Sequence, residues 1–252
     1  MMPEEYQNHL LTDAQVAEFV VRGYLVFKPD FPEGFNDQIY KECAAATAHG
    51  NPGDAILERV PKLHDVWDHP VVKGALASLL GDDFTMSGHR HCHVNPPGSR
   101  SQGWHQDGVN QRHHQVRVCL GFYYPQATPH ELGPTSLVPG THFRNAPTDR
   151  MASYANFRDQ VDLVCEAGTV AIVHYDIWHA ATRNCGNKTR YMLKFLFNRA
   201  SEPTRPNWNH DPASIGKAMG ILGGRATING QSDHYKERRL RREMWNHLVG
   251  AA

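Results

Sequence analysis

The sequence lacks the features of a secreted, disulfide-stabilised protein. Its five cysteines are an odd number, are spread along the chain and form no C-x-x-C pair, which argues against a framework of disulfide bonds. The N-terminal stretch MMPEEYQNHLLTDAQ has neither the basic segment nor the apolar segment of a signal peptide. We therefore expect a reduced, cytoplasmic setting.

The chain also lacks a net charge and a long apolar run. Lys and Arg together number 26, as do Asp and Glu, so no bulk charge attracts nucleic acid or an anionic membrane. No uninterrupted apolar stretch approaches the roughly 20 residues that span a bilayer. A P-loop, a G-x-G-x-x-G fingerprint, a G-x-S-x-G nucleophile elbow and zinc-finger spacing are all missing. We expect a small-molecule partner, with no nucleic acid and no membrane, while the oligomeric state stays unknown.

Histidine is what the sequence has in excess, with 17 in 252 residues, and the N-terminal third reads as helical. Between about residues 10 and 80, Thr12 is placed to cap a helix, with Gln15 completing a capping box. A second helix is predicted from Phe35 to about Thr47. A third begins at Pro70 and ends at Gly81.

From about residue 83 to 200 the pattern changes to short β-rich runs separated by Pro, Gly and Asn. Many short strands with turn signals predict a mainly β fold, a sandwich or barrel such as a jelly roll. An extension, about 201–252, ends in a predicted helix whose arginine-rich face we expect to be solvated or packed on a subunit rather than bound to nucleic acid. We expect residues 1–252 to form a single domain.

Two His-x-Asp triplets are candidates for a metal site, His105-Gln106-Asp107 and His174-Tyr175-Asp176. Residues two apart on a strand face the same side and can hold one ion. After Asp176 too little β-rich chain remains to close a barrel around a metal. After Asp107 several strands follow, and His179 begins a later one. Two histidines and a carboxylate that leave open positions form the facial triad of non-haem Fe(II) oxygenases, so we favour His105, Asp107 and His179.

Arg190 supports the same interpretation. It lies at the start of RYMLKFLF, eleven positions after His179. An arginine that points into a barrel is costly unless it meets an anion. Its guanidinium can bind a carboxylate through two parallel hydrogen bonds, and the far carboxylate of an iron-chelating keto diacid is a suitable guest.

The ordered motifs WHQD, GPTSLVPGTH, GTVAIVHYDIWHAATRN and RYMLKF resemble the phytanoyl-CoA dioxygenase family of Fe(II)/2-oxoglutarate oxygenases. The helical opening LTDAQVAEFVVRGYLVF is similar too, so the resemblance covers about residues 10–200. It implies a double-stranded β-helix, jelly-roll or cupin-like, with flanking helices mostly from the N-terminal part. It further implies that His105, Asp107 and His179 ligate Fe(II), that Arg190 anchors 2-oxoglutarate, and that Tyr123 lies beside this cosubstrate.

The resemblance implies an O₂-consuming dioxygenase that hydroxylates a small organic molecule and releases succinate and CO₂. Two other functions stay open. One is an O₂-independent cupin-type isomerase or hydrolase that uses His89, His91 and His93, with a glutamate such as Glu131. The other is a non-catalytic metal-binding or sensing domain.

Several other residues have weaker signals. We expect Cys185 to be inert and His142 to be a structural turn residue, and the His89–His93 strand to contact substrate or to pack rather than to hold its own metal. Aromatic or polar residues near the expected pocket mouth are Trp104, Asn110, His113, His114 and Tyr124. They form no recognisable anion clamp, so the substrate is not specified.

Overall fold

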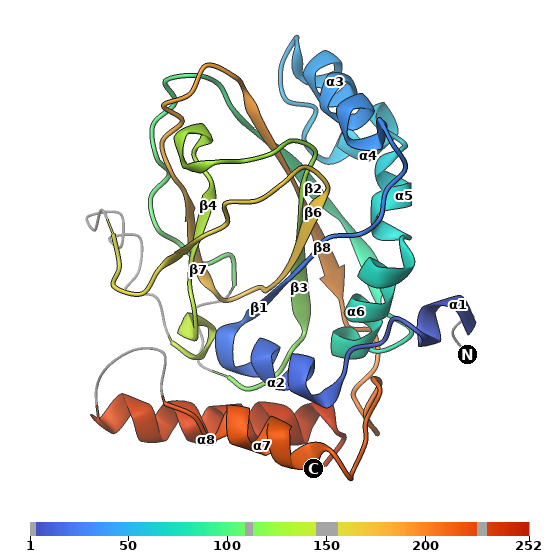
Figure 1. Ribbon diagram of the computed structural model, residues 1–252, viewed down its shortest axis with the longest axis vertical. Coiled ribbons are helices and arrows are strands. Elements are labelled where there is room, and N and C mark those ends of the chain that lie inside the picture. The colour runs from blue at the N-terminus through green and yellow to red at the C-terminus, as the bar shows by residue number, and fades with distance from the viewer. Residues whose placement is uncertain (1–3, 109–112, 145–155, 226–230, 252) are drawn as a thin grey trace.

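The computed structural model describes residues 4–108, 113–144, 156–225 and 231–251. Two β-sheets face each other, and helices cover the outer side of the larger one (Figure 1). The strands are β1 (Tyr24–Phe27), β2 (Thr85–Asn95), β3 (Val118–Tyr124), β4 (Thr135–Val138), β5 (Val161–Asp162), β6 (Thr169–His174), β7 (Trp178–Ala181) and β8 (Arg190–Asn198). The helices are α1 (Glu4–Gln7), α2 (Asp13–Arg22), α3 (Phe35–Thr47), α4 (Ile56–Arg59), α5 (Leu63–Trp67), α6 (Pro70–Leu80), α7 (Ile215–Leu222) and α8 (Gln231–Leu248).

The three helices predicted from the N-terminal third are confirmed. Thr12 caps α2 through a complete capping box with Gln15, and Gly23 ends that helix in the left-handed conformation. Helix α3 has the predicted bounds, and α6 begins at Pro70. The expectation of a mainly β middle section is also confirmed, because β2 to β8 all lie between residues 85 and 198.

The larger sheet is antiparallel, with strand order β1-β6-β3-β8-β2, and the smaller has the order β5-β4-β7. A further segment extends the smaller sheet beyond β7. There the backbones of His105 and His179 exchange two hydrogen bonds, of 3.1 and 2.9 Å. This pairing brings together two histidines that are 74 positions apart in sequence.

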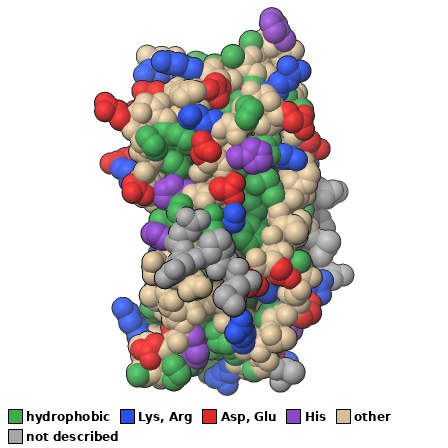
Figure 2. Space-filling view, turned by 90° about the vertical axis from the view of Figure 1, so that its right-hand side faces the viewer, with side chains coloured by type: hydrophobic (Ala, Val, Ile, Leu, Met, Phe, Trp, Pro, Cys, Tyr) green, Lys and Arg blue, Asp and Glu red, His purple; other side chains and the backbone are tan. Residues whose placement is uncertain are grey.

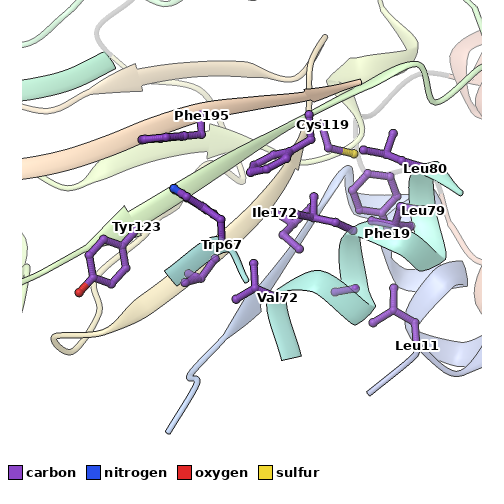
Figure 3. Packing of buried hydrophobic residues seen from close by; sticks show 14 of the residues in the cluster. Leu11, Phe19, Trp67, Val72, Leu79, Leu80, Cys119, Tyr123, Ile172 and Phe195 are labelled. Atoms are coloured by element: carbon purple, nitrogen blue, oxygen red, sulfur yellow. The ribbon is translucent and has the colours of Figure 1, made fainter. Parts of the chain in front are cut away.

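Alternation along β8 divides the interior into two hydrophobic clusters. Met192 and Leu196 belong to the cluster between the two sheets, whereas Leu193, Phe195 and Phe197 belong to the cluster beneath the helices. Figure 3 shows this helix-side packing, with Trp67 beside Phe195. The inward positions of β8 therefore line the space between the sheets, which we call the lumen.

The extension beyond residue 200 packs against α2 rather than standing apart (Figure 1). Its arginine-rich helix α8 is not simply solvated. Arg241 is fully buried, pairs with Glu237 at 2.5 Å and donates to backbone carbonyls just after α7, whereas Arg239 and Arg242 are exposed. On the face shown in Figure 2, acidic and basic side chains are interspersed, without a block of one sign. Within the described residues, none of the helices is long and apolar enough to cross a membrane.

Asp13 joins the two ends of the chain. This buried carboxylate accepts hydrogen bonds from Trp208 Nε1 (2.7 Å), from the backbone N–H of Asp211 (2.9 Å) and from His210 Nδ1 (2.7 Å). Burial alone would raise the pKa of Asp13, but the hydrogen bonds outweigh burial and the pKa lies below its usual value. The ionised form is thus the one the fold stabilises.

We expect Asp13→Asn to lower the free energy of unfolding by about 2 kcal/mol at pH 7. Because the pKa of Asp13 is depressed in the folded state, its contribution is fully present above the ordinary aspartate pKa and is lost as the pH falls through the folded value. Urea unfolding of both proteins between pH 7 and pH 3 measures the difference. Asp37→Asn, at an exposed position, is the control. A difference that stays constant with pH would contradict the role of the charge.

Candidate metal centre

Three side chains from two distant segments meet at the edge of the smaller sheet. Nε2 of His105 lies 3.7 Å from Oδ1 of Asp107, and Nε2 of His179 lies 3.8 Å from Oδ2. One ligand atom from each residue falls within 4.8 Å of the others. Ligands bound about 2.1 Å from a cation at right angles are about 3 Å apart, so a small inward movement would complete the site. In the described part of the chain, this is the only such group of three or more His, Cys, Asp or Glu side chains.

Both histidines are held in the tautomer that a metal ligand needs. Nδ1 of His105 donates to the carbonyl of Gly103 (2.9 Å), and Nδ1 of His179 donates to the carbonyl of Ile177 (3.1 Å). Each ring therefore presents the lone pair of Nε2 toward Asp107. Burial lowers the pKa of His179 to about 4, so this imidazole is neutral near pH 7 and can donate its lone pair.

Asp107 is paired with a cation from the opposite sheet. Lys194 donates to its Oδ2 at 2.9 Å. Burial opposes the charge of Asp107, but His179 and Lys194 together outweigh burial and hold the pKa of this carboxyl below its usual value. The residue is therefore a carboxylate, as metal binding requires. Lys194 did not appear among the candidates from sequence, although alternation from Arg190 along RYMLK places both on the same face.

The second His-x-Asp triplet forms no part of this group. His174 ends β6, and Asp176 lies in the turn before β7. Nδ1 of His174 accepts the backbone N–H of Asp176 (3.1 Å), and the Asp176 carboxylate lies 3.1 Å from Nε2 of His113. Asp176 nevertheless contacts the metal centre indirectly, because Gly108 packs directly against its carboxylate.

We expect Gly108→Ala to weaken binding of Mn(II), used as an air-stable probe, by roughly tenfold. A Cβ at Gly108 would collide with Oδ1 of Asp176, and the backbone that must shift carries Asp107. Calorimetric titration of the metal-free protein measures the affinity. Gly88→Ala is the control, since a Cβ there meets nothing within 4 Å. Equal affinities in both variants would show that Asp176 does not position this backbone.

Arg190 is fully buried at the start of β8, and none of its three guanidinium nitrogens has a hydrogen-bond partner. Burial lowers its pKa, yet an arginine stays charged in proteins. The hydroxyl-bearing ring of Tyr124, also fully buried, is its electrostatic neighbour. A buried, charged and unpartnered guanidinium is costly, so this geometry fits an anionic guest.

Tyr123 is not brought to the site, which corrects the expectation that it lies beside a cosubstrate. Residues on β3 alternate, and Tyr123 belongs to the cluster beneath the helices. Its hydroxyl donates to Oδ1 of Asn36 (2.6 Å), and its ring contacts Phe31. The neighbouring Tyr124 is the tyrosine that belongs to the lumen cluster.

The histidines of β2 do not converge on one point. His89 is exposed and lies 3.0 Å from Asp54, within an irregularity in the strand pairing. His91 and His93 lie side by side, with ring centroids 4.6 Å apart. Glu131 is exposed and contributes its backbone carbonyl to the N–H groups of residues 185 and 186. A cupin-type ligand set from these residues is therefore not formed.

The remaining predicted residues have varied surroundings. His142 is structural, as expected, since Nε2 donates to the carbonyl of Val20 (3.0 Å). His114 lies near α8, with its ring centroid 5.8 Å from that of His247. Trp104 packs on Phe157. Cys185 is an exposed free thiol, and Asn110 lies outside the described residues.

Comparison with known proteins agrees with the fold. No curated protein sequence matches the chain. Among solved structures, the non-haem α-ketoglutarate-dependent epimerase SnoN from nogalamycin biosynthesis is 17% identical, with 75% of this chain and 84% of that chain covered at a TM-score of 0.61. EctD from S. alaskensis, crystallised with 2-oxoglutarate and 5-hydroxyectoine, is 18% identical, with 79% and 80% covered at 0.61. The carbocyclase SnoK is 19% identical, with 79% and 88% covered at 0.61.

At these identities the structural likeness establishes the fold alone. The sequence pattern of the phytanoyl-CoA dioxygenase (PhyH) family, however, matches residues 10–192, which is most of the chain. That range contains the triad and Arg190. The chain therefore belongs to the phytanoyl-CoA dioxygenase family.

Proposed function

We propose that this protein is an Fe(II)- and 2-oxoglutarate-dependent dioxygenase that hydroxylates a small organic molecule. The observation that carries the proposal is the combination of a two-histidine, one-carboxylate group with a buried, unpartnered guanidinium in the same lumen. The family uses Fe(II), 2-oxoglutarate and O₂. The two facing sheets are consistent with a double-stranded β-helix.

His105, Asp107 and His179 would hold Fe(II) through two Nε2 atoms and a carboxylate oxygen. Arg190 would bind the far carboxylate of 2-oxoglutarate, with Tyr124 beside it. When bound, this pair supplies the activation of O₂, with release of succinate and CO₂ and oxidation of the substrate. Two histidines and one carboxylate leave positions free on an octahedral metal, which this chemistry needs.

The chain's own contribution is to position the reactants and to exclude water. The carbonyls of Gly103 and Ile177 fix the two imidazoles, and in the metal-free protein Lys194 donates to the carboxylate of Asp107. Apolar side chains surround the lumen: Leu120, Phe122, Leu137, Val173, Ile177, Met192 and Leu196. Such walls exclude water and strengthen the electrostatic interactions inside.

We propose hydroxylation rather than halogenation, because halogenases of this fold lack the carboxylate ligand and Asp107 supplies it here. SnoN is described as an epimerase and SnoK as a carbocyclase, so related folds direct the same cofactors to other products. Which product forms depends on the position of the substrate C–H bond. The cupin-type alternative is weakened by the separation of His89 from His91 and His93.

An anaerobic titration of the metal-free protein with Fe(II) and 2-oxoglutarate tests the proposal. A visible charge-transfer band should appear only when both are present, and succinate should form on admission of air. No band in the wild-type protein would overturn the assignment. Substrate conversion that continues without 2-oxoglutarate would favour the O₂-independent alternative, and a band without any succinate would favour a binding or sensing domain.

A further inference from the structure

Lys194 has no role in the proposed binding of 2-oxoglutarate at Arg190, yet it lies at the centre of the site. Its side chain is almost buried, with 8% of the residue exposed, and its ammonium contacts Asp107 at 2.9 Å. A buried lysine without a counter-charge is unfavourable. In the metal-free protein Asp107 is that counter-charge. When a divalent cation binds the same carboxylate, the single negative charge of Asp107 is shared between two cations. The charge of Lys194 is then only partly neutralised.

Two histidines flank Lys194 on the same wall of the lumen. In the pairing of β2 with β8, His91 lies opposite Lys194 and His93 lies opposite Met192. Nε2 of His93 is buried and has no hydrogen-bond partner. Burial and, next, the charge of Lys194 lower the pKa of both imidazoles, that of His93 to about 3. Both rings are therefore neutral, and each can donate a hydrogen bond from one nitrogen.

Lys194 and Arg190 lie at opposite ends of this wall. Arg190 and Lys194 are four residues apart on one strand, which places their Cα atoms about 13 Å apart. 2-Oxoglutarate bound at Arg190 would reach the metal with its 2-oxo acid end. Lys194 is beside the metal, at the other end of the wall, where a carboxylate of the reacting molecules would meet it.

We propose that Lys194, with His91 and His93 beside it, is a second carboxylate-binding subsite, and that it holds a carboxylate group of the substrate. This proposal rests on the proposed function. One ammonium with two neutral imidazoles suits a singly charged anion. A phosphate ester or diphosphate would call for an arginine fork or several cations, and the described lumen offers neither beside Lys194. The 2-oxo acid end of the cosubstrate carries a carboxylate too and is the other group that fits this subsite. The experiment distinguishes it from a carboxylate of the substrate.

The test compares the wild-type protein with Lys194→Met, loaded anaerobically with Fe(II). In the first arm, pyruvate is titrated and the charge-transfer band recorded, since pyruvate is a 2-oxo acid without the far carboxylate. In the second arm, the unreactive analogue N-oxalylglycine occupies the cosubstrate site, and matched pairs are titrated by calorimetry: proline and prolinamide, hexanoate and hexanamide, benzoate and benzamide. Lys188→Met, at an exposed position, is the control.

We expect at least one carboxylate to bind the wild type and the control roughly tenfold more tightly than its amide, and this preference to disappear in Lys194→Met. Because Lys194 also contacts the ligand Asp107, Fe(II) is kept saturating in all three proteins, and under that condition pyruvate affinity should stay within about twofold. If pyruvate affinity falls instead while the pairs are unaffected, the subsite holds the 2-oxo acid end and the substrate assignment is overturned. If Lys194→Met changes neither the pyruvate affinity nor the preference for a carboxylate over its amide, the subsite itself is overturned. The same holds if none of the carboxylates binds the wild type. A missing band in the wild type would instead refute the proposed function.

Discussion

Replacing His179 with alanine should abolish the charge-transfer band of the protein with Fe(II) and 2-oxoglutarate. His179 is buried, neutral and held with Nε2 toward Asp107, so its removal leaves only His105 and Asp107 of the group. Loss of a hydrogen-bond partner behind a metal ligand costs up to about 100-fold in affinity, and loss of the ligand itself should exceed that. Titration of metal-free His179→Ala with Fe(II) and 2-oxoglutarate, followed by its visible spectrum, measures the effect.

His174→Asn is the matched control for this result. His174 is equally buried but forms part of the other triplet, where its Nδ1 accepts a hydrogen bond from the backbone of Asp176. An asparagine keeps an acceptor at that place. The variant should therefore retain the band, with a lower free energy of unfolding. A band that survives in His179→Ala and is lost in His174→Asn would assign the metal to the downstream triplet.

Replacing Arg190 with methionine should have two effects of opposite sign. Affinity for 2-oxoglutarate should fall roughly 100-fold, because the far carboxylate loses its charged partner. The protein without cosubstrate should become more stable by about 2 kcal/mol, since an unpartnered buried charge is replaced by an apolar side chain of similar length. Band titrations and urea unfolding measure the two effects separately.

The contrast between the two measurements makes this test specific. A merely structural arginine would lower stability when removed and would affect 2-oxoglutarate and pyruvate equally. Pyruvate affinity should instead stay unchanged in Arg190→Met, because pyruvate has no far carboxylate. Arg183→Met, at an exposed position, should change neither quantity. Loss of stability together with unchanged 2-oxoglutarate affinity would exclude Arg190 as the anchor.

Local signals in the sequence predicted most of the fold. Caps and breakers such as Thr12 with Gln15, Pro70 and Gly81 act within a few residues, so they define α2 and α6 directly. The proximity of His105, Asp107 and His179 was predictable for a different reason, because only the upstream triplet is followed by enough β-rich runs to supply strands that face it. Both kinds of signal can be read from the sequence without knowing which distant residues are in contact.

The choice between Tyr123 and Tyr124 shows where such signals end. In β3 every residue from Cys119 to Tyr124 is buried, because helices cover one face of the sheet and the second sheet covers the other. A strand buried on both faces has no polar side to fix the phase of its alternation. Moving the phase by one residue exchanges the two tyrosines. Arg241 is a similar case, because only the distant loop after α7 reveals that this arginine is buried.

The contact between α2 and the C-terminal segment has a consequence for how the chain is synthesised and folded. Asp13 leaves the ribosome almost 200 residues before Trp208, its hydrogen-bond partner. At about 5–20 residues per second, that interval lasts on the order of 10–40 s. During this time the apolar side of α2 that later meets α7 has no cover. A nascent chain would therefore expose the apolar side of α2 to a chaperone until α7 has been synthesised.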